Sequence, residues 1–161
     1  MSRKAPGGKL SFSVEASIRS SPSKAWEALT DMDQLSRWFC TRANIEAKAG
    51  APFEFHFERD GFVDEGEVLA VQKNKLVKLR VAGGDGRTGP PEMTVTWKLA
   101  KEGAGTKVVL EQEVPMLNMD ACKMTKDSVV PWGFYVHNLK TFLEQGVDER
   151  GGYWHKNGDR I

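Results

Sequence analysis

Cysteine is scarce in this chain of 161 residues, which contains only Cys40 and Cys122. Neither residue belongs to a Cys-x-x-Cys pair or to a Cys/His spacing typical of zinc ligands, so we expect no metal site. Thiols that lie far apart in the sequence are typical of a reducing compartment, where disulfides do not persist. The cysteine usage therefore predicts a cytoplasmic protein without a metal site, and we expect no other cofactor.

Long hydrophobic runs are absent as well. A helix that spans a membrane needs about 20 consecutive apolar residues, and no segment of the sequence approaches this length. Residues 1–9 are polar and contain Pro6, Gly7 and Gly8, so they lack the apolar core of a signal peptide. We expect these residues to form a flexible leader on a soluble protein that does not insert into a membrane.

Neither sign of charge is in clear excess, because Lys and Arg total 23 and Asp and Glu total 22. Nucleic acids and anionic membranes attract proteins that carry clustered, uncompensated cations. Arg3, Lys4 and Lys9 form the only basic cluster, and we interpret them as part of the solvated leader. The charge balance therefore excludes nucleic acid as the main partner.

Familiar catalytic signatures are also missing. No serine lies in a Gly-x-Ser-x-Gly elbow, and the glycine-rich residues 83–89 lack the Gly-Lys-Ser/Thr sequence of a phosphate loop. His56, His137 and His155 share no spacing that suits a metal site or a general base. His56 also alternates with phenylalanines and should face solvent. The sequence therefore identifies no catalytic residue.

What the sequence does contain is a series of segments in which apolar and polar residues alternate. Residues 10–19 show this pattern, which is typical of a half-buried strand. The pattern returns over residues 53–57, 62–72, 77–81, 93–99 and 106–114. Asp60 and Gly61 separate two of these segments with a strong hairpin signal. Successive strands joined by short turns predict an antiparallel sheet.

Helical patterns flank the strands. Ser21 suits an N-cap and Pro22 the first helical position, so we expect a short helix over residues 22–29 and a second over 33–38. The longest helical pattern covers residues 130–145, where aromatic and aliphatic residues form a broad apolar stripe. This order of elements predicts an α+β fold in which the long helix covers one face of the sheet.

In order, these elements resemble the START-like superfamily, which is also called the Bet v 1-like or SRPBCC superfamily. Within it they resemble most the Hsp90 ATPase activator homologue family, near the polyketide cyclase and dehydrase-like proteins. The resemblance is carried by residues 18–22, 26–31, 35–39, 66–71, 95–99, 105–110 and 132–144. It implies a helix-grip domain over residues 10–146. In this fold a curved antiparallel sheet wraps around a long C-terminal helix, with two short helices after the first strand. Residues 147–161 would follow as a polar tail.

The resemblance also implies a hydrophobic cavity between the sheet and the terminal helix. The candidates for its lining are Trp38, Phe39, Phe55, Phe57, Val68, Leu79, Val95, Trp97, Trp132, Tyr135, Val136 and Leu139. The segment before the terminal helix is rich in methionine, which suits an adaptable surface, and its candidate lid residues are Met116, Leu117, Met119 and Met124. Ordinary core packing remains the alternative interpretation of each lining candidate, and a packed connecting loop remains the alternative to the lid.

Three functions remain open at this point. The first is a binding module that holds a small hydrophobic or aromatic molecule in the cavity. The second, which follows from the resemblance alone, is a chaperone-associated protein that interacts with an Hsp90-type partner. The third is a cyclase or hydrolase, which would need Tyr135 or an inward charged residue as its acid–base group. The sequence also leaves the choice between a monomer and a homodimer open.

An inward carboxylate would be a functional candidate, because an apolar cavity raises the pKa of a carboxyl group. The charged residues considered for this position are Arg37, Arg42, Glu54, Glu58, Glu67, Glu111 and Glu113. The alternation places Glu54 and Glu58 on the outer face of their strand. We expect most of the others to be solvated as well, and the pattern does not single out an inward one.

Overall fold

The computed structural model describes residues 9–83, 92–115 and 130–152, so the candidate lid residues lie outside the described part of the chain. In sequence order its elements are β1 (Lys9–Ile18), α1 (Pro22–Thr30), α2 (Met32–Trp38), β2 (Arg42–Ile45), β3 (Pro52–Phe57), β4 (Phe62–Gln72), β5 (Leu76–Val81), β6 (Met93–Glu102), β7 (Gly105–Pro115) and α4 (Val130–Gln145). The two short helices, the long helix and all the predicted strands are present. β2 is an additional strand that the sequence did not predict.

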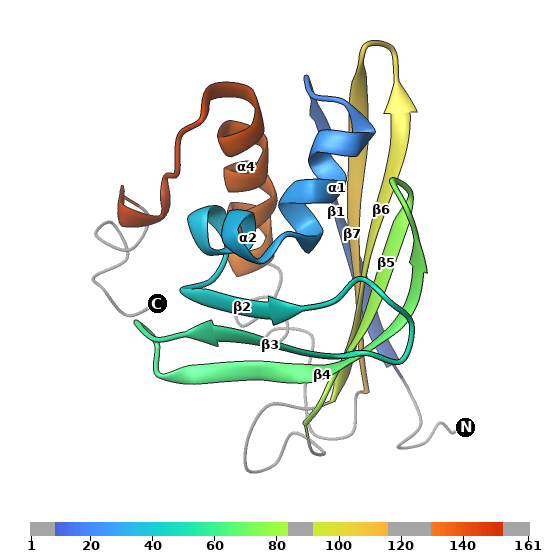
Figure 1. Ribbon diagram of the computed structural model, residues 1–161, viewed down its shortest axis with the longest axis vertical. Coiled ribbons are helices and arrows are strands. Elements are labelled where there is room, and N and C mark those ends of the chain that lie inside the picture. Colours follow the sequence, from blue (N-terminus) through green and yellow to red (C-terminus); the bar gives the residue numbers. More distant parts are fainter. Residues whose placement is uncertain (1–8, 84–91, 116–129, 153–161) are drawn as a thin grey trace.

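The strands form one seven-stranded antiparallel sheet in the order β1-β7-β6-β5-β4-β3-β2 (Figure 1). The sheet is strongly curved, and β2, β3 and β4 run across the direction of β1, β6 and β7 in Figure 1. Two features of β4 accompany this curvature. The pairing register with β5 shifts between Val68 and Ala70, as at a bulge that bends a strand. Gly66 lies so close to β5 that a Cβ atom there would collide with the backbone carbonyl of Arg80.

Side-chain caps define the two short helices. The Ser21 hydroxyl oxygen accepts a hydrogen bond from the Lys24 backbone N–H at 3.2 Å, which caps the start of α1. Asp31 ends α1 and begins α2, because its N–H donates to the Glu27 carbonyl while its Oδ1 accepts from the Asp33 N–H at 2.8 Å. These caps satisfy backbone groups that a helix end leaves unpaired.

The helices cover the concave face of the sheet (Figure 1), and hydrogen bonds of Trp38 join them. Its side chain is fully buried, and the indole Nε1 donates to the Ala28 carbonyl oxygen of α1 at 2.8 Å. Its own carbonyl oxygen accepts from Nδ2 of Asn138 on α4, also at 2.8 Å. The curved sheet around α4, with α1 and α2 after the first strand, confirms the predicted helix-grip fold.

Residues that follow α4 bond back to the rest of the fold. Asp148 Oδ1 accepts a hydrogen bond from Nδ2 of the buried Asn138 at 3.0 Å. The Arg150 guanidinium donates to the carbonyl oxygens of Cys40 and Ser36, each at 3.0 Å. The chain after α4 is thereby tied to the end of α2, close to the aromatic residues described next.

Candidate ligand-binding cavity

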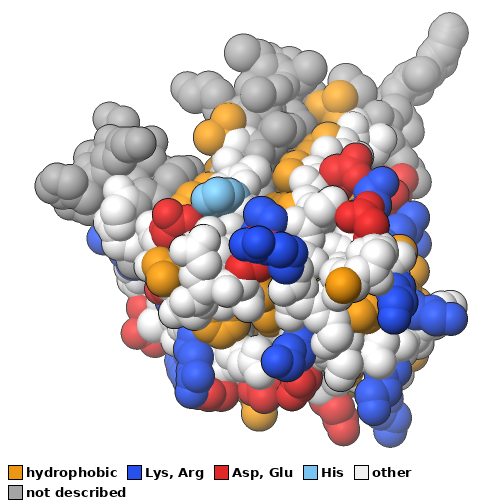
Figure 2. Space-filling model, turned by 90° about the horizontal axis from the view of Figure 1, so that it is seen from above, with side chains coloured by type: hydrophobic (Ala, Val, Ile, Leu, Met, Phe, Trp, Pro, Cys, Tyr) orange, Lys and Arg blue, Asp and Glu red, His pale blue; other side chains and the backbone are white. Residues whose placement is uncertain are grey.

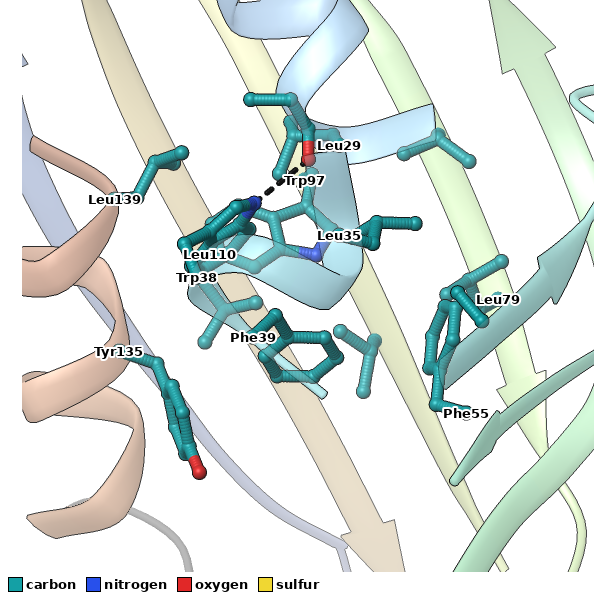
Figure 3. Packing of buried hydrophobic residues seen from close by; sticks show 14 of the residues in the cluster. Leu29, Leu35, Trp38, Phe39, Phe55, Leu79, Trp97, Leu110, Tyr135 and Leu139 are labelled. Atoms are coloured by element: carbon teal, nitrogen blue, oxygen red, sulfur yellow. Dashed lines mark hydrogen bonds between the residues drawn. The ribbon is translucent and has the colours of Figure 1, made fainter. Parts of the chain in front are cut away.

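Aromatic rings from α2, α4 and the sheet meet on the concave face (Figure 3). Phe39, which follows α2, lies with its ring centroid 5.4 Å from that of Phe55 and 5.6 Å from that of Trp132. Trp97 meets Trp38 edge-on at 6.1 Å and Trp132 edge-on at 5.8 Å. Stacked and edge-to-face rings at these separations attract one another. The rings from the end of α2, from α4 and from the sheet therefore form one aromatic cluster.

A small cavity lies beside this cluster. It is lined by Leu29, Leu35, Trp38, Phe39, Phe55, Asp64, Val77, Leu79, Val81, Met93, Val95, Trp97 and Trp132. The cavity offers about 30 Å³ to the centres of water-sized molecules, which is room for a few waters. Pockets that enclose drug-sized ligands are larger, at about 300–1,000 Å³. A ligand with several rings therefore has to move part of the wall.

The cavity wall contains part of the predicted lining. The predicted residues that line it are Trp38, Phe39, Phe55, Leu79, Val95, Trp97 and Trp132. The predicted residues that are buried in the same core without lining it are Phe57, Val68, Tyr135, Val136 and Leu139. The Tyr135 ring, for example, leans from α4 against Phe39 at 5.2 Å but does not border the cavity. The pattern of a strand or helix predicts which of its side chains point inward. The border of a cavity depends instead on which of these inward side chains leave a gap between them.

Asp64 is the charged side chain of the described wall, and the sequence analysis did not single it out. It lies directly opposite Phe55 in the β3–β4 register, and side chains directly opposite in an antiparallel pair share one face of the sheet. Burial among apolar groups raises the pKa of the Asp64 carboxyl from 3.8 to about 6. A signal for this position did exist, because Asp64 has the same phase along β4 as the buried Val68.

The neighbourhood of Asp64 contains no described group that compensates its charge. No hydrogen bond or ion pair joins it to another residue within the described ranges. Its titratable neighbour is the Cys40 thiol, whose pKa burial raises to about 12, with a smaller contribution from the Asp64 charge and a lowering by Arg150. That thiol is therefore neutral at physiological pH, and Asp64 is a carboxylate without a counter-ion among the described residues.

The charged residues that the sequence analysis considered lie away from the cavity. Glu67 pairs with Arg80 on the outer face, and Glu111 pairs with Lys98. His56, as expected, lies on the outer face of β3, where Nε2 is 3.0 Å from Oε1 of Glu54. On the face of the molecule seen in Figure 2, acidic and basic side chains are interspersed and no large patch of one sign forms.

Neither a cluster of metal ligands nor a helix that could span a membrane is found among the described residues. They contain no group of three or more His, Cys, Asp or Glu side chains that could hold a metal ion. Within the same ranges, no helix has the length and apolar character needed to cross a membrane. The cavity with its single acidic group is therefore the candidate site that the described part of the chain offers.

Solved structures with the same fold include DynU16 and CalU16. DynU16, from the dynemicin biosynthetic locus, superposes with a TM-score of 0.74 at 23% identity, over 87% of this chain and 49% of that protein. The chain thus spans about half the length of DynU16. CalU16 from Micromonospora echinospora has a TM-score of 0.69 at 20% identity, over 98% of this chain and 89% of that one.

The Aha1 dimer from Colwellia psychrerythraea also has this fold, with a TM-score of 0.70 at 21% identity over 85% of this chain and 98% of that one. At such identities the likeness establishes the fold alone. No curated protein matches the sequence. Residues 19–144, from the end of β1 to the last turn of α4, match the family described as activator of Hsp90 ATPase homolog 1-like protein. This match confirms the predicted resemblance: the chain belongs to the activator of Hsp90 ATPase homolog 1-like family, within the START-like superfamily.

Proposed function

We propose that this protein binds a small hydrophobic or aromatic molecule in the cavity between the sheet and α4. The observation that carries the proposal is the cavity itself, because Trp38, Trp97 and Trp132 all form part of its wall. Protein interiors are normally packed as densely as organic crystals, so a cavity beside three tryptophans is an unusual feature of a core. Concave sites with apolar, aromatic walls are the usual places for small ligands.

The small size of the cavity suggests how a ligand larger than water would enter. Trp132 is the wall residue that α4 contributes, and its side chain is only partly buried. Trp38, in contrast, is fully buried and held by the hydrogen bond to Ala28. We infer that a ligand displaces the Trp132 ring and then stacks on Phe39, against which the Trp132 ring lies in this structure.

Ligand binding can be tested with naphthylmethanol, a neutral aromatic probe, by titration of tryptophan fluorescence and by thermal unfolding. A ligand that binds only the folded state stabilises it by about 2.7 kcal/mol at a hundredfold excess over its dissociation constant. We expect both signals to saturate together. If neither naphthylmethanol nor any member of a broad panel of apolar compounds changes the melting temperature, the protein does not have this function.

A matched pair of valine substitutions links the signal to the cavity. Val81→Phe adds a ring to the wall, whereas Val63→Phe makes the same change at an exposed position on β4. We expect Val81→Phe to weaken binding of the probe at least about tenfold by filling the space, and Val63→Phe to leave it unchanged. Cooperative thermal unfolding of each variant establishes that it is folded. Equal binding by both variants would place the probe elsewhere.

A second candidate function is interaction with an Hsp90-type chaperone. It is favoured by the family to which residues 19–144 belong and by the likeness to the Colwellia Aha1 dimer. The purified protein would then stimulate the ATPase activity of an Hsp90-type chaperone at micromolar concentration. Absence of stimulation would count against this candidate and leave the ligand-binding proposal unaffected. The same ATPase assay with an added ligand would show whether ligand binding changes the stimulation.

A further inference from the structure

We propose that Asp64 makes the cavity selective for a ligand that carries a basic nitrogen on an aromatic or apolar body. This inference rests on the proposed function and names the class of ligand that the same cavity takes. Its geometric basis is a carboxyl group in the wall of a cavity that is otherwise formed by apolar and aromatic side chains.

The position of Asp64 is set by the sheet. Its backbone lies in the middle of the β3–β4 pairing, between the pairs Phe53–Gly66 and Phe57–Phe62. The Asp64 side chain therefore shares the concave face with Phe55, whereas the adjacent Glu65 belongs to the opposite face. A functional group carried by a paired strand is positioned more sharply than one carried by a loop.

The groups that face Asp64 provide no alternative partner among the described residues. On β3 the opposite residue is Phe55, and the charged or titratable side chains Glu54 and His56 bond to one another on the outer face. From the segment after α2 comes the neutral Cys40 thiol, and from α4 the wall residue is Trp132. A buried carboxylate is normally paired or hydrogen-bonded, because an unpaired charge in an apolar setting is costly. A bound cation would supply the missing partner.

The aromatic wall favours the same class of ligand. The faces of tryptophan and phenylalanine rings attract ammonium groups, and the cavity offers rings from Trp38, Phe39 and Trp97 beside the carboxylate. A neutral ligand would leave the Asp64 charge unpaired, and an anionic ligand such as a fatty acid would place a second negative charge next to it. Since burial raises the Asp64 pKa only to about 6, most of the carboxyl is ionised at neutral pH and can pair with an ammonium group.

The test compares naphthylmethylamine, which is a cation at neutral pH, with naphthylmethanol, which has the same ring system and no charge. We expect the wild-type protein to bind the amine at least about tenfold more tightly at neutral pH, a difference that one charge-assisted contact can supply. Asp64→Asn removes the charge with little change of shape and should abolish the preference. The matched control is Glu65→Gln, on the same strand and exposed, which should retain it.

A pH titration of the wild-type protein gives an independent result if Asp64→Asn fails to fold. The amine remains charged between about pH 7.5 and pH 5, whereas Asp64 takes up a proton in this interval. The preference for the amine should therefore fall toward that of Asp64→Asn as the pH is lowered. Equal binding of both probes by the wild-type protein, or an unchanged preference in Asp64→Asn, overturns this inference while the proposed function stands. If neither probe binds, this inference fails, and the proposed function fails with it only if no member of the apolar panel binds either.

Discussion

On the outer face of β4, Oε1 of Glu67 lies 3.3 Å from Nε of Arg80; on its concave face, Asp64 has no such partner among the described residues. A similar ion pair lies between exposed side chains of β7 and β1, where Lys107 Nζ is 2.9 Å from Glu15 Oε2. Exposed pairs of this kind contribute little, because water already solvates both charges. Among these three carboxylates the inward Asp64 is the unusual one, because it is removed from water and no described salt bridge compensates its charge.

Replacement of an aromatic residue on the concave side should have the largest effect. Trp38→Ala removes a fully buried ring and its hydrogen bond to the Ala28 carbonyl, so we expect the free energy of unfolding to fall by about 3–5 kcal/mol. Leu69→Ala, at an exposed position on β4, should change it by no more than about 0.5 kcal/mol. Urea unfolding measures both. Similar losses in the two variants would remove the distinction between the faces.

The next effect concerns Asp64 and depends on pH. Below about pH 3 the carboxyl is protonated in the folded and unfolded states, and burial costs little. As the pH rises through about 6, the unfolded chain ionises first, because its pKa is near 3.8 whereas that of folded Asp64 is about 6. Stability is therefore lost over this interval, by roughly 3 kcal/mol at 1.36 kcal/mol for each tenfold change in proton affinity.

Asp64→Asn should abolish this loss. We expect the variant to gain up to about 3 kcal/mol relative to the wild-type protein on going from about pH 4 to about pH 7.5. Urea unfolding at the two pH values measures the difference, and any constant cost of the buried amide cancels. Glu67→Gln is the matched control, and its effect should stay below about 1 kcal/mol at both values. A pH-independent effect of Asp64→Asn would indicate that its carboxylate is already compensated.

A smaller effect is expected at Gln112, a second polar residue of the concave face. Its side chain is buried, its Nε2 contacts Met93 Sδ at 2.7 Å, and its Oε1 has no hydrogen-bond partner within the described ranges. Gln112→Met should therefore raise the free energy of unfolding by about 1 kcal/mol, because it removes an unsatisfied acceptor and keeps the volume. A loss of similar size in thermal or urea unfolding would instead indicate a bound water at Oε1.

The smallest effect should belong to the outer pair. A double-mutant cycle on Glu67 and Arg80 should give a coupling energy of about 0.2–1 kcal/mol that decreases as salt is added. The Arg80 guanidinium also contacts Glu92 at 3.2 Å, so the cycle should use Glu67→Gln and Arg80→Gln with Glu92 present. A coupling well above this range would mean that the outer face, too, holds charges that water does not reach.

Much of the fold could be predicted from the sequence because its information is local. The alternation in β3 correctly placed Phe53, Phe55 and Phe57 inward, and Ser21 and Pro22 correctly placed the start of α1. β2 escaped prediction because four residues are too few to establish a period. Strand phase and capping chemistry thus sufficed for the architecture.

The site was predicted less completely, for physical reasons. Asp64 has the inward phase of β4, yet a polar residue at such a position in the sequence looks like an interruption of the pattern. The border of the cavity depends on contacts between distant segments, such as Phe39 with Trp132. Local periodicity contains no information about which of these contacts leave a gap. Long-range packing therefore had to be seen before the acidic group could be assigned to the cavity.

The place of β1 in the sheet has a consequence for synthesis of the protein. β1 lies at one edge of the sheet that the described strands form, next to β7, and Lys9 pairs with Pro115 and Ile18 with Thr106. During translation the segment of β1 leaves the ribosome long before β7 does. Until β7 has been made, the apolar side chains of β1 have no strand to pair with. Closure of such distant pairs is slow. The helix-grip domain thus completes its sheet only after β7, near its C-terminal end, has been made.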